Sequence, residues 1–180
     1  LSDDKIAEAC QAASIDGKIV VPANFNAPSQ VVIAGHSEAV DRFAELAKGT
    51  TNIEWKARKV IPLNVSAPFH CPLMNSTALA FEAFLQKTDW KPMAFPVVSN
   101  VDAQLRASGA MTSVLKDQID HPVLWTSCVQ TLQRLGIRRF VEMGPSRVLT
   151  GLVKRIVDDV EALSLDSLEE LQAFEKGLQK

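Results

Sequence analysis

His70 is the side chain best placed for chemistry in this sequence. It lies between Pro68 and Pro72, directly after residues 56–65, which are expected to be extended. Loops at strand ends are where α/β enzymes carry catalytic groups, and imidazole titrates near neutral pH, so His70 suits general acid–base work. The spacing alone nevertheless favours a plainer role, a loop histidine with one backbone hydrogen bond. Cys71 is not expected to pair with His70, because neighbours on a turn point their side chains apart.

Residues 35–39 read GHSEA, which is close to the G-x-S-x-G nucleophile elbow of serine hydrolases. The elbow needs small residues around a strained turn, and Ala39 stands where the last glycine would be. Ser37 follows a predicted strand and precedes a predicted helix, so we expect it to be a helix N-cap. His36 is then an ordinary loop histidine.

Two further segments carry polar groups next to a predicted helix. His121 precedes Pro122, which favours an extended backbone and a capping or packing role at the start of a helix. Residues 144–146 (GPS), between a strand and a helix, could present N–H groups to an anion or form a tight turn with an N-cap, which we favour. The carboxylates are scattered and form no metal-ligand pattern, so no metal site is expected.

The composition is that of an ordinary globular protein. The chain has 180 residues, of which 47% are hydrophobic and 22% charged, with a formal net charge of −2. Bulk nucleic-acid binding needs a basic footprint, and a membrane span needs about 18 consecutive apolar residues, so neither partner is expected. The three cysteines form no CxxC pair, which favours buried thiols in a reducing, cytoplasmic compartment. The chain begins at Leu1 without a signal peptide, so we expect a piece of a longer protein.

Residues 1–64 predict a small mixed subdomain. A helix is expected over residues 2–13, with Ser2 as its N-cap, and a second helix over residues 38–48. Two short β runs, residues 18–23 and 30–34, flank a loop rich in Asn and Pro, as in a hairpin. With residues 56–65 as a further strand, the order is that of a βαββαβ ferredoxin-like unit that lacks its first strand.

Residues 65–180 alternate helices and strands, which is typical of an α/β layer structure. The predicted strands are residues 95–99, 139–143 and 160–163. The predicted helices are residues 74–85, 111–119, 122–135 and 148–156, and a last helix that begins at the capping box after Ser167. We therefore expect two packed subdomains, residues 1–64 and 65–180, with no flexible linker between them.

Several stretches in a fixed order resemble one known family. The matching segments are residues 22–28 (PANFNAP), 30–36 (QVVIAGH), 65–70 (VSAPFH), 96–102 (PVVSNVD), 118–122 (QIDHP) with Trp125, 142–145 (EMGP) and 148–152 (VLTGL). They are similar to the malonyl-CoA:acyl carrier protein transacylases of bacterial fatty-acid synthesis and, more loosely, to polyketide-type acyltransferase domains. The resemblance implies that residues 65–180 are the C-terminal part of an α/β-hydrolase-like acyltransferase core.

The resemblance also implies a reaction. In this family a serine in a G-H-S-x-G elbow takes malonyl from coenzyme A and passes it to the thiol of acyl carrier protein. A histidine moves the protons, and His70 matches it. A backbone carbonyl orients that histidine, and the residue that offers it matches Gln118. Malonyl-CoA is a substrate, and no cofactor is implied.

Two residues are substrate-binding candidates on the same resemblance. A bulky aromatic directly before the histidine goes with malonyl selectivity in related acyltransferases, because the ring leaves little room beside the substrate α-carbon. Phe69 stands in that place. Asn26, with Asn24, lies on the loop that would face the active-site cleft, although asparagine is also ordinary in a turn.

The departures from the family are equally informative. The serine elbow, an N-terminal glutamine loop and the arginine that clamps the malonyl carboxylate find no match here. We therefore expect a C-terminal portion of such an enzyme, inactive alone, whose partner is the missing N-terminal part of the same protein. Two alternatives stay open: a polyketide-type acyltransferase with another extender unit, and a non-catalytic module that docks acyl carrier protein.

Overall fold

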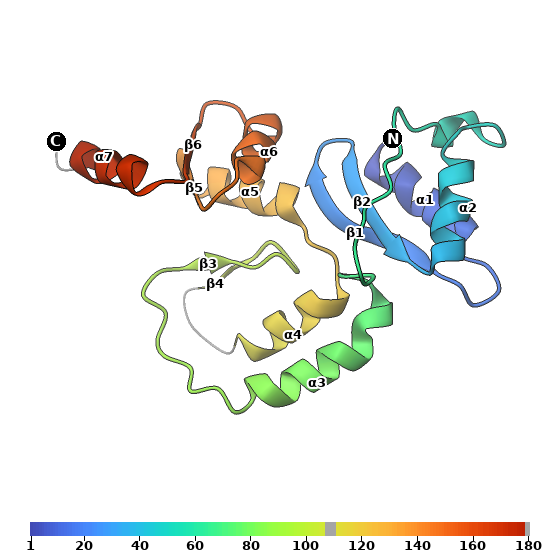
Figure 1. The fold of residues 1–180 in the computed structure, drawn as a ribbon, viewed down its shortest axis with the longest axis horizontal. Coiled ribbons are helices and arrows are strands. Elements are labelled where there is room, and N and C mark those ends of the chain that lie inside the picture. Colours follow the sequence, from blue (N-terminus) through green and yellow to red (C-terminus); the bar gives the residue numbers. More distant parts are fainter. Residues whose placement is uncertain (107–110, 179–180) are drawn as a thin grey trace. The chain divides into compact units, whose positions relative to one another are not determined.

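The computed structural model describes residues 1–106 and 111–178, which form two compact units, Leu1–Cys128 and Val129–Lys180. The described elements alternate helices and strands, which confirms the α/β class (Figure 1). The subdomain boundary predicted after residue 64 lies inside the first unit. That division stays a prediction.

The first unit opens with a β-hairpin and two helices that share one core. In the chain, helix α1 (Asp3–Ala13) precedes and helix α2 (Ser37–Leu46) follows the antiparallel strands β1 (Val20–Ala27) and β2 (Gln30–Gly35). Their apolar positions recur at helical spacing and pack together, which confirms this helix–strand–strand–helix order. The buried cluster is Ile6, Ala9, Cys10, Ala13, Val20, Ala39, Phe43 and Ala47.

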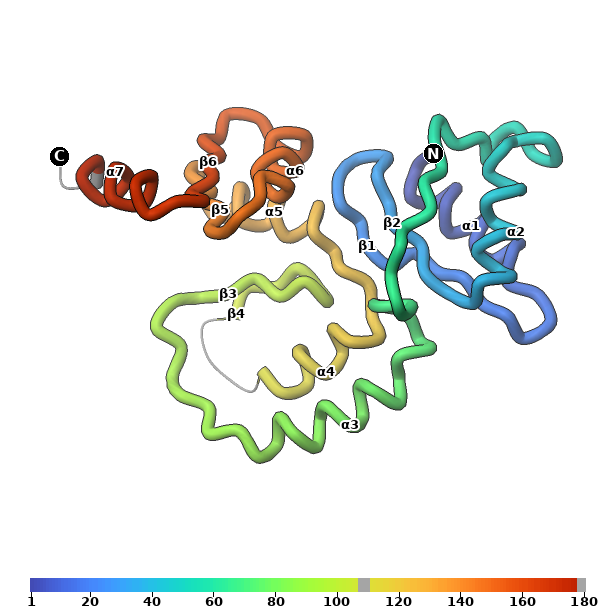
Figure 2. Tube along the Cα trace, viewed as in Figure 1, coloured from blue at the N-terminus to red at the C-terminus, as the bar shows by residue number. Residues whose placement is uncertain are grey.

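The predicted strand over residues 56–65 is wrong. A 3-10 turn, η1 (Ile53–Trp55), is followed by an open stretch of chain that pairs with no strand among the described residues (Figure 2). Its apolar side chains are largely exposed: Val60 by 44%, Ile61 by 59% and Val65 by 62%. The apolar run resembles a strand, but it lacks the backbone partner that makes one. The ferredoxin-like topology, which counted this strand, is therefore not confirmed.

The rest of the first unit carries the loop of His70. A 3-10 turn, η2 (Pro72–Met74), leads into α3 (Asn75–Leu85), which packs against α4 (Thr112–Asp120). Between them β3 (Val97–Val98) and β4 (Leu105–Arg106) form a short antiparallel pair. Pro122 does not begin the next helix as expected, because α5 (Trp125–Arg134) begins three residues later. The backbone between Pro122 and Trp125 bonds β1 instead: the N–H of Val123 donates to Ala23, and its carbonyl accepts from Phe25.

The second unit is built on a β–α–β motif. Strands β5 (Arg139–Met143) and β6 (Glu161–Leu165) pair in parallel, with α6 (Val148–Ile156) between them in the chain and α7 (Leu168–Leu178) after them. A parallel pair needs such a crossover connection. The strands predicted near residues 139–143 and 160–163 are confirmed.

All three cysteines are free and buried, as predicted. Burial raises the pKa of the Cys10 thiol to about 12 and that of Cys128 to about 11, and it also raises the pKa of Cys71. These groups are neutral thiols at ordinary pH, so Cys71 offers no thiolate to its neighbour. Separately, none of the helices in the described residues combines the length and the apolar content that crossing a membrane requires.

Candidate active site

Two consecutive carbonyl groups at the end of α4 hold His70. Its backbone N–H donates to the carbonyl oxygen of Ile119 at 3.2 Å. Its ring Nδ1 lies 2.7 Å from the carbonyl oxygen of Gln118. A carbonyl only accepts, so Nδ1 carries the proton and the neutral ring is left with Nε2 as its acceptor. The backbone of His70 has φ = 60°, in the left-handed region that residues other than glycine rarely adopt.

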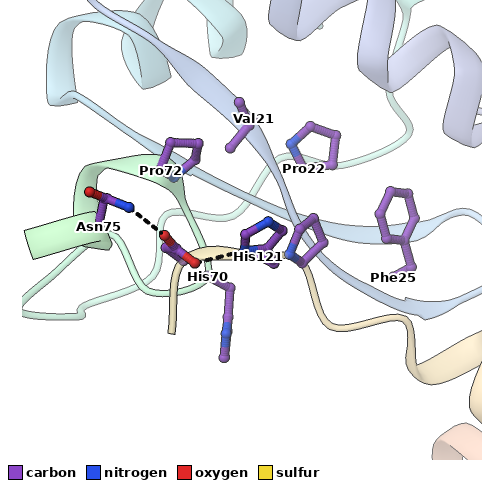
Figure 3. Close-up of a pocket in the computed structure, with 9 residues that line it drawn as sticks. Val21, Pro22, Phe25, His70, Pro72, Asn75 and His121 are labelled. Carbon is purple, nitrogen blue, oxygen red and sulfur yellow. Dashed lines mark hydrogen bonds and ion pairs between the residues drawn. The ribbon is translucent and has the colours of Figure 1, made fainter. Parts of the chain in front are cut away.

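His70 borders a pocket of about 580 Å³, within the range of small-molecule sites (Figure 3). One side of the pocket is the apolar surface of β1, and the other is made by the His70 loop, the start of α3 and the end of α4. The lining residues are Val21, Pro22, Phe25, His70, Pro72, Asn75, Asp120, His121 and Pro122. A mostly apolar trough thus carries a few polar groups on one side.

Asp120 is the centre of a hydrogen-bonded group on that polar side. Its side chain is only 6% exposed. Oδ2 accepts from Nδ2 of Asn75 at 3.1 Å, and Oδ1 lies 2.6 Å from Nδ1 of His121. Burial alone would raise the pKa of the Asp120 carboxyl, but these hydrogen bonds outweigh it, and the pKa lies below its ordinary value. The group is therefore a buried carboxylate at neutral pH, held by the two interactions drawn as dashed lines in Figure 3.

The geometry invites comparison with known proteins, although no family model matches the chain. A malonyl CoA-acyl carrier protein transacylase of Escherichia coli (strain K12) is 42% identical over 167 residues, which are 92% of this chain and 52% of that protein. The crystal structure of a malonyl-CoA:acyl carrier protein transacylase from Xanthomonas oryzae pv. oryzae matches with a TM-score of 0.89 at 38% identity, covering 98% of this chain and 55% of that one.

The chain is a homologue of malonyl-CoA–acyl carrier protein transacylases. It spans about half the length of the curated relatives it matches. A further solved structure, described as a type II polyketide synthase acyl-carrier protein in complex with its malonyl-transacylase, matches with a TM-score of 0.89 at 39% identity, over 98% of this chain and 56% of that one. The α/β fold is thus that of the solved transacylases.

Of the residues that the transacylase resemblance singles out, the structure brings two together. His70 and Gln118 meet through the ring and the backbone carbonyl. Phe69 is 49% exposed, and Asn26 is half-buried in β1; neither lines the pocket, where Phe25 stands instead. The catalytic roles of His70 and Gln118 and the binding roles of Phe69 and Asn26 stay predictions.

The near-match to a serine elbow has a structural explanation. A side chain at Gly35 would place its Cβ 2.1 Å from the carbonyl oxygen of Ile19, so close packing requires glycine there. His36 is tied to the same residue, since its ring Nδ1 accepts from the N–H of Ile19 at 3.1 Å. The expectation that Ser37 caps α2 is wrong by one position: His36 is the N-cap, and the Ser37 hydroxyl donates to Glu38.

The turn at residues 144–146 does not leave free N–H groups for an outside anion. The carboxylate of Glu142, at the end of β5, accepts from the N–H groups of Leu149 at 3.2 Å and Thr150 at 2.7 Å in the first turns of α6. It also accepts from the hydroxyls of Ser146 and Thr150. Against the opposing effect of burial, these bonds lower the pKa of Glu142 to about 2. The protein's own carboxylate thus fills this helix N-terminus.

The last turn of α4 brings two carboxylates and a histidine together. Asp117, Asp120 and His121 each offer a ligand atom, and these atoms lie within 4.8 Å of one another. The oxygens of Asp120 already bond Asn75 and His121, and Asp117 pairs with Lys116 at 2.8 Å. Protein partners therefore satisfy this group, and we assign no metal to it.

Sequence reasoning missed Asp120 and Asn75 as members of the pocket. One signal was available for Asp120. A carboxylate in the last turn of a helix faces the negative end of the helix dipole, so acidic residues are disfavoured there. Asp120 is the last residue of α4. Such a residue calls for a specific partner, although nothing in the sequence identifies Asn75 as that partner.

Proposed function

We propose that the complete protein transfers malonyl from coenzyme A to the thiol of acyl carrier protein, the first step of type II fatty-acid synthesis. The acyl-enzyme forms on a serine supplied from outside these 180 residues, since no G-H-S-x-G motif occurs among them. His70 is the general base and acid. The carbonyl of Gln118 fixes its tautomer, so that Nε2 is the nitrogen that exchanges protons.

The transfer consists of two linked nucleophilic acyl substitutions. In the first, the serine hydroxyl attacks the malonyl thioester, its proton goes to Nε2 of His70, the C–S bond breaks, and the proton passes to the departing thiolate of coenzyme A. In the second, the carrier-protein thiol gives its proton to Nε2 and attacks the serine ester, the C–O bond to the serine oxygen breaks, and that oxygen takes the proton back. One histidine thus serves both half-reactions.

The observation that carries the proposal is the 2.7 Å contact between Nδ1 of His70 and the carbonyl oxygen of Gln118, at the edge of a pocket. It fits a base that needs one ring nitrogen held and the other free. The similarity to transacylases over 92% of the chain supports the choice of reaction.

The same proposal includes the partners and the setting. Malonyl-CoA is a substrate, no cofactor or metal takes part, and acyl carrier protein is the acceptor. The remaining part of the complete protein, which we take to be N-terminal to this chain, supplies the nucleophile and the group that binds the malonyl carboxylate. Three buried neutral thiols suit a cytoplasmic protein. The 180-residue chain alone has no transacylase activity.

The test replaces His70 by Ala in the complete protein and follows malonyl transfer by the mass of the carrier protein. We expect transfer to fall by at least about 10³-fold, because loss of the base removes proton transfer from both half-reactions. His36→Asn is the matched control, since its amide oxygen can still accept from Ile19. Near-normal transfer by His70→Ala would refute the assignment and favour a non-catalytic docking module.

Substrate selectivity is a second arm of the same assay. We propose that Phe69 favours malonyl by filling the space beside its α-carbon. Phe69→Ser should let methylmalonyl-CoA compete better by about 10-fold, the scale of one methyl group in a pocket. An unchanged ratio would contradict the steric role and leave the extender unit to be set elsewhere.

A further inference from the structure

We propose that Asp120 is a positioning residue for His70: its buried carboxylate joins the start of α3 to the end of α4 and thereby fixes the loop and the carbonyl groups that hold the base. This inference rests on the proposed function of His70. It adds a residue that bonds Asn75 and His121 and acts on the geometry around the base.

The chain connectivity around His70 supports this role. His70 is held by the carbonyl groups of Gln118 and Ile119, the two residues directly before Asp120 in the last turn of α4. On the other side, Asn75 lies five residues after His70 and begins α3. The bond from Nδ2 of Asn75 to Oδ2 of Asp120, at 3.1 Å, therefore closes a ring that contains the His70 loop. Without that bond, His70 keeps its two hydrogen bonds to α4 and α3 still packs against α4, but the buried link between Asn75 and Asp120 is lost.

The other carboxylate oxygen of Asp120 bonds His121. Oδ1 of Asp120 lies 2.6 Å from Nδ1 of His121, so the ring donates to the carboxylate. The side chain of Gln118 donates from Nε2 to the carbonyl oxygen of His121 at 3.3 Å. His121 thus bonds both Gln118, whose carbonyl group holds His70, and Asp120, whose carboxylate reaches α3. Both histidines line one pocket, but the ring of His121 is 53% exposed and its role here is support.

The position of Asp120 is also energetically costly. A buried carboxylate at the C-terminal end of a helix is unfavourable twice, through desolvation and through the helix dipole. The bonds from Asn75 and His121 reverse this, as the lowered pKa of Asp120 reports. An apolar residue would fill the same place without either penalty. A sequence that keeps a local conflict next to a strained residue, His70 at φ = 60°, indicates a geometric requirement there.

The experiment compares Asp120→Ala with the wild type in the complete protein labelled with ¹⁵N-histidine. In the wild type, the ring of His70 should show a single neutral tautomer with its proton on Nδ1. In Asp120→Ala we expect a mixture of tautomers and a fall in kcat on the order of 10²-fold, as for a small misplacement of a catalytic group. KM for malonyl-CoA should stay within about twofold, because both carboxylate oxygens of Asp120 already bond Asn75 and His121.

Four further variants make the test specific. Asn75→Ala cuts one arm and should lower kcat by about 10-fold, and it decides the question if Asp120→Ala does not fold. His121→Asn keeps an N–H donor at the position of Nδ1 and should stay within about threefold of the wild type, whereas His121→Ala should not. Asp102→Asn is the matched control, since this carboxylate is hydrogen-bonded to Gln104 and Arg106 away from the pocket.

The outcomes separate this inference from the proposed function. If His70→Ala abolishes transfer but Asp120→Ala and Asn75→Ala keep a single His70 tautomer and a normal kcat, the positioning role is refuted and the proposed function stands. If His70→Ala transfers malonyl normally, the proposed function fails first. A loss of kcat in Asp102→Asn equal to that in Asp120→Ala would reduce the effect to general destabilisation and also overturn the inference.

Discussion

At the scale of single residues, His70 combines an unfavourable backbone with specific contacts. Its φ of 60° is a left-handed conformation that costs a residue with a Cβ about 1 kcal/mol. The contacts from its N–H to Ile119 and from its ring to Gln118 hold the residue there. The strain therefore accompanies the ring orientation that the proposed chemistry uses.

This strain can be measured apart from catalysis. His70→Gly and His70→Ala both remove the ring and its bond to Gln118, but only glycine relieves the left-handed backbone. We expect His70→Gly to be more stable than His70→Ala by about 1 kcal/mol in urea unfolding of the complete protein, with both variants inactive. Equal stabilities, or a more stable alanine variant, would show that the backbone of His70 is not strained.

At the scale of elements, Glu142 ties the end of β5 to the start of α6. Its carboxylate accepts from two backbone N–H groups and two hydroxyls, which hold its pKa at about 2 in the folded protein, against 4.5 ordinarily. A lowered carboxyl pKa means that the folded state binds this proton less readily than the unfolded state. The stabilisation is therefore fully present above pH 4.5 and is lost as the pH falls towards 2.

The corresponding variant is Glu142→Gln, which keeps the shape of the side chain and removes the charge. We expect it to be less stable at pH 6 by about 1 kcal/mol, the usual worth of a helix cap. Between pH 4.5 and 2.5 the wild type should lose stability that the variant does not lose, so the two curves converge. Hydrogen exchange of the Thr150 amide, measured across this range, reports the opening of α6 directly. Parallel curves would contradict the prediction.

The elements also show how far the sequence predicts this structure. The hairpin and the β5–α6–β6 motif follow from short apolar runs between turn residues, which is local information. Residues 56–65 carry the same signal but pair with no strand among the described residues, because pairing depends on a partner and not on propensity. The site lies beyond local rules: His70 and Gln118 are 48 residues apart, and Asn75 and Asp120 are 45 apart. The first pair came from the family resemblance, and the second came from the fold.

At the scale of the whole molecule, the second unit exposes apolar surface that such a motif normally covers. Parallel strands are usually buried on both faces, yet Val141 of β5 is 36% exposed and Met143 is 69% exposed. Val148, at the start of α6, is 64% exposed. Because the chain spans about half the length of its relatives, we predict that the remaining part of the complete protein covers β5.

Met143 provides the measurement, because a thioether is oxidised by peroxide according to its exposure. In the isolated 180-residue chain we expect Met143 to be oxidised quickly, and in the complete protein at least about 10-fold more slowly, with peptide mass spectrometry as the readout. Met74, which is half-buried beside the His70 loop in the first unit, serves as the internal reference. Equal oxidation of Met143 in both proteins would mean that β5 faces solvent in the complete protein too, and that its remaining part packs elsewhere.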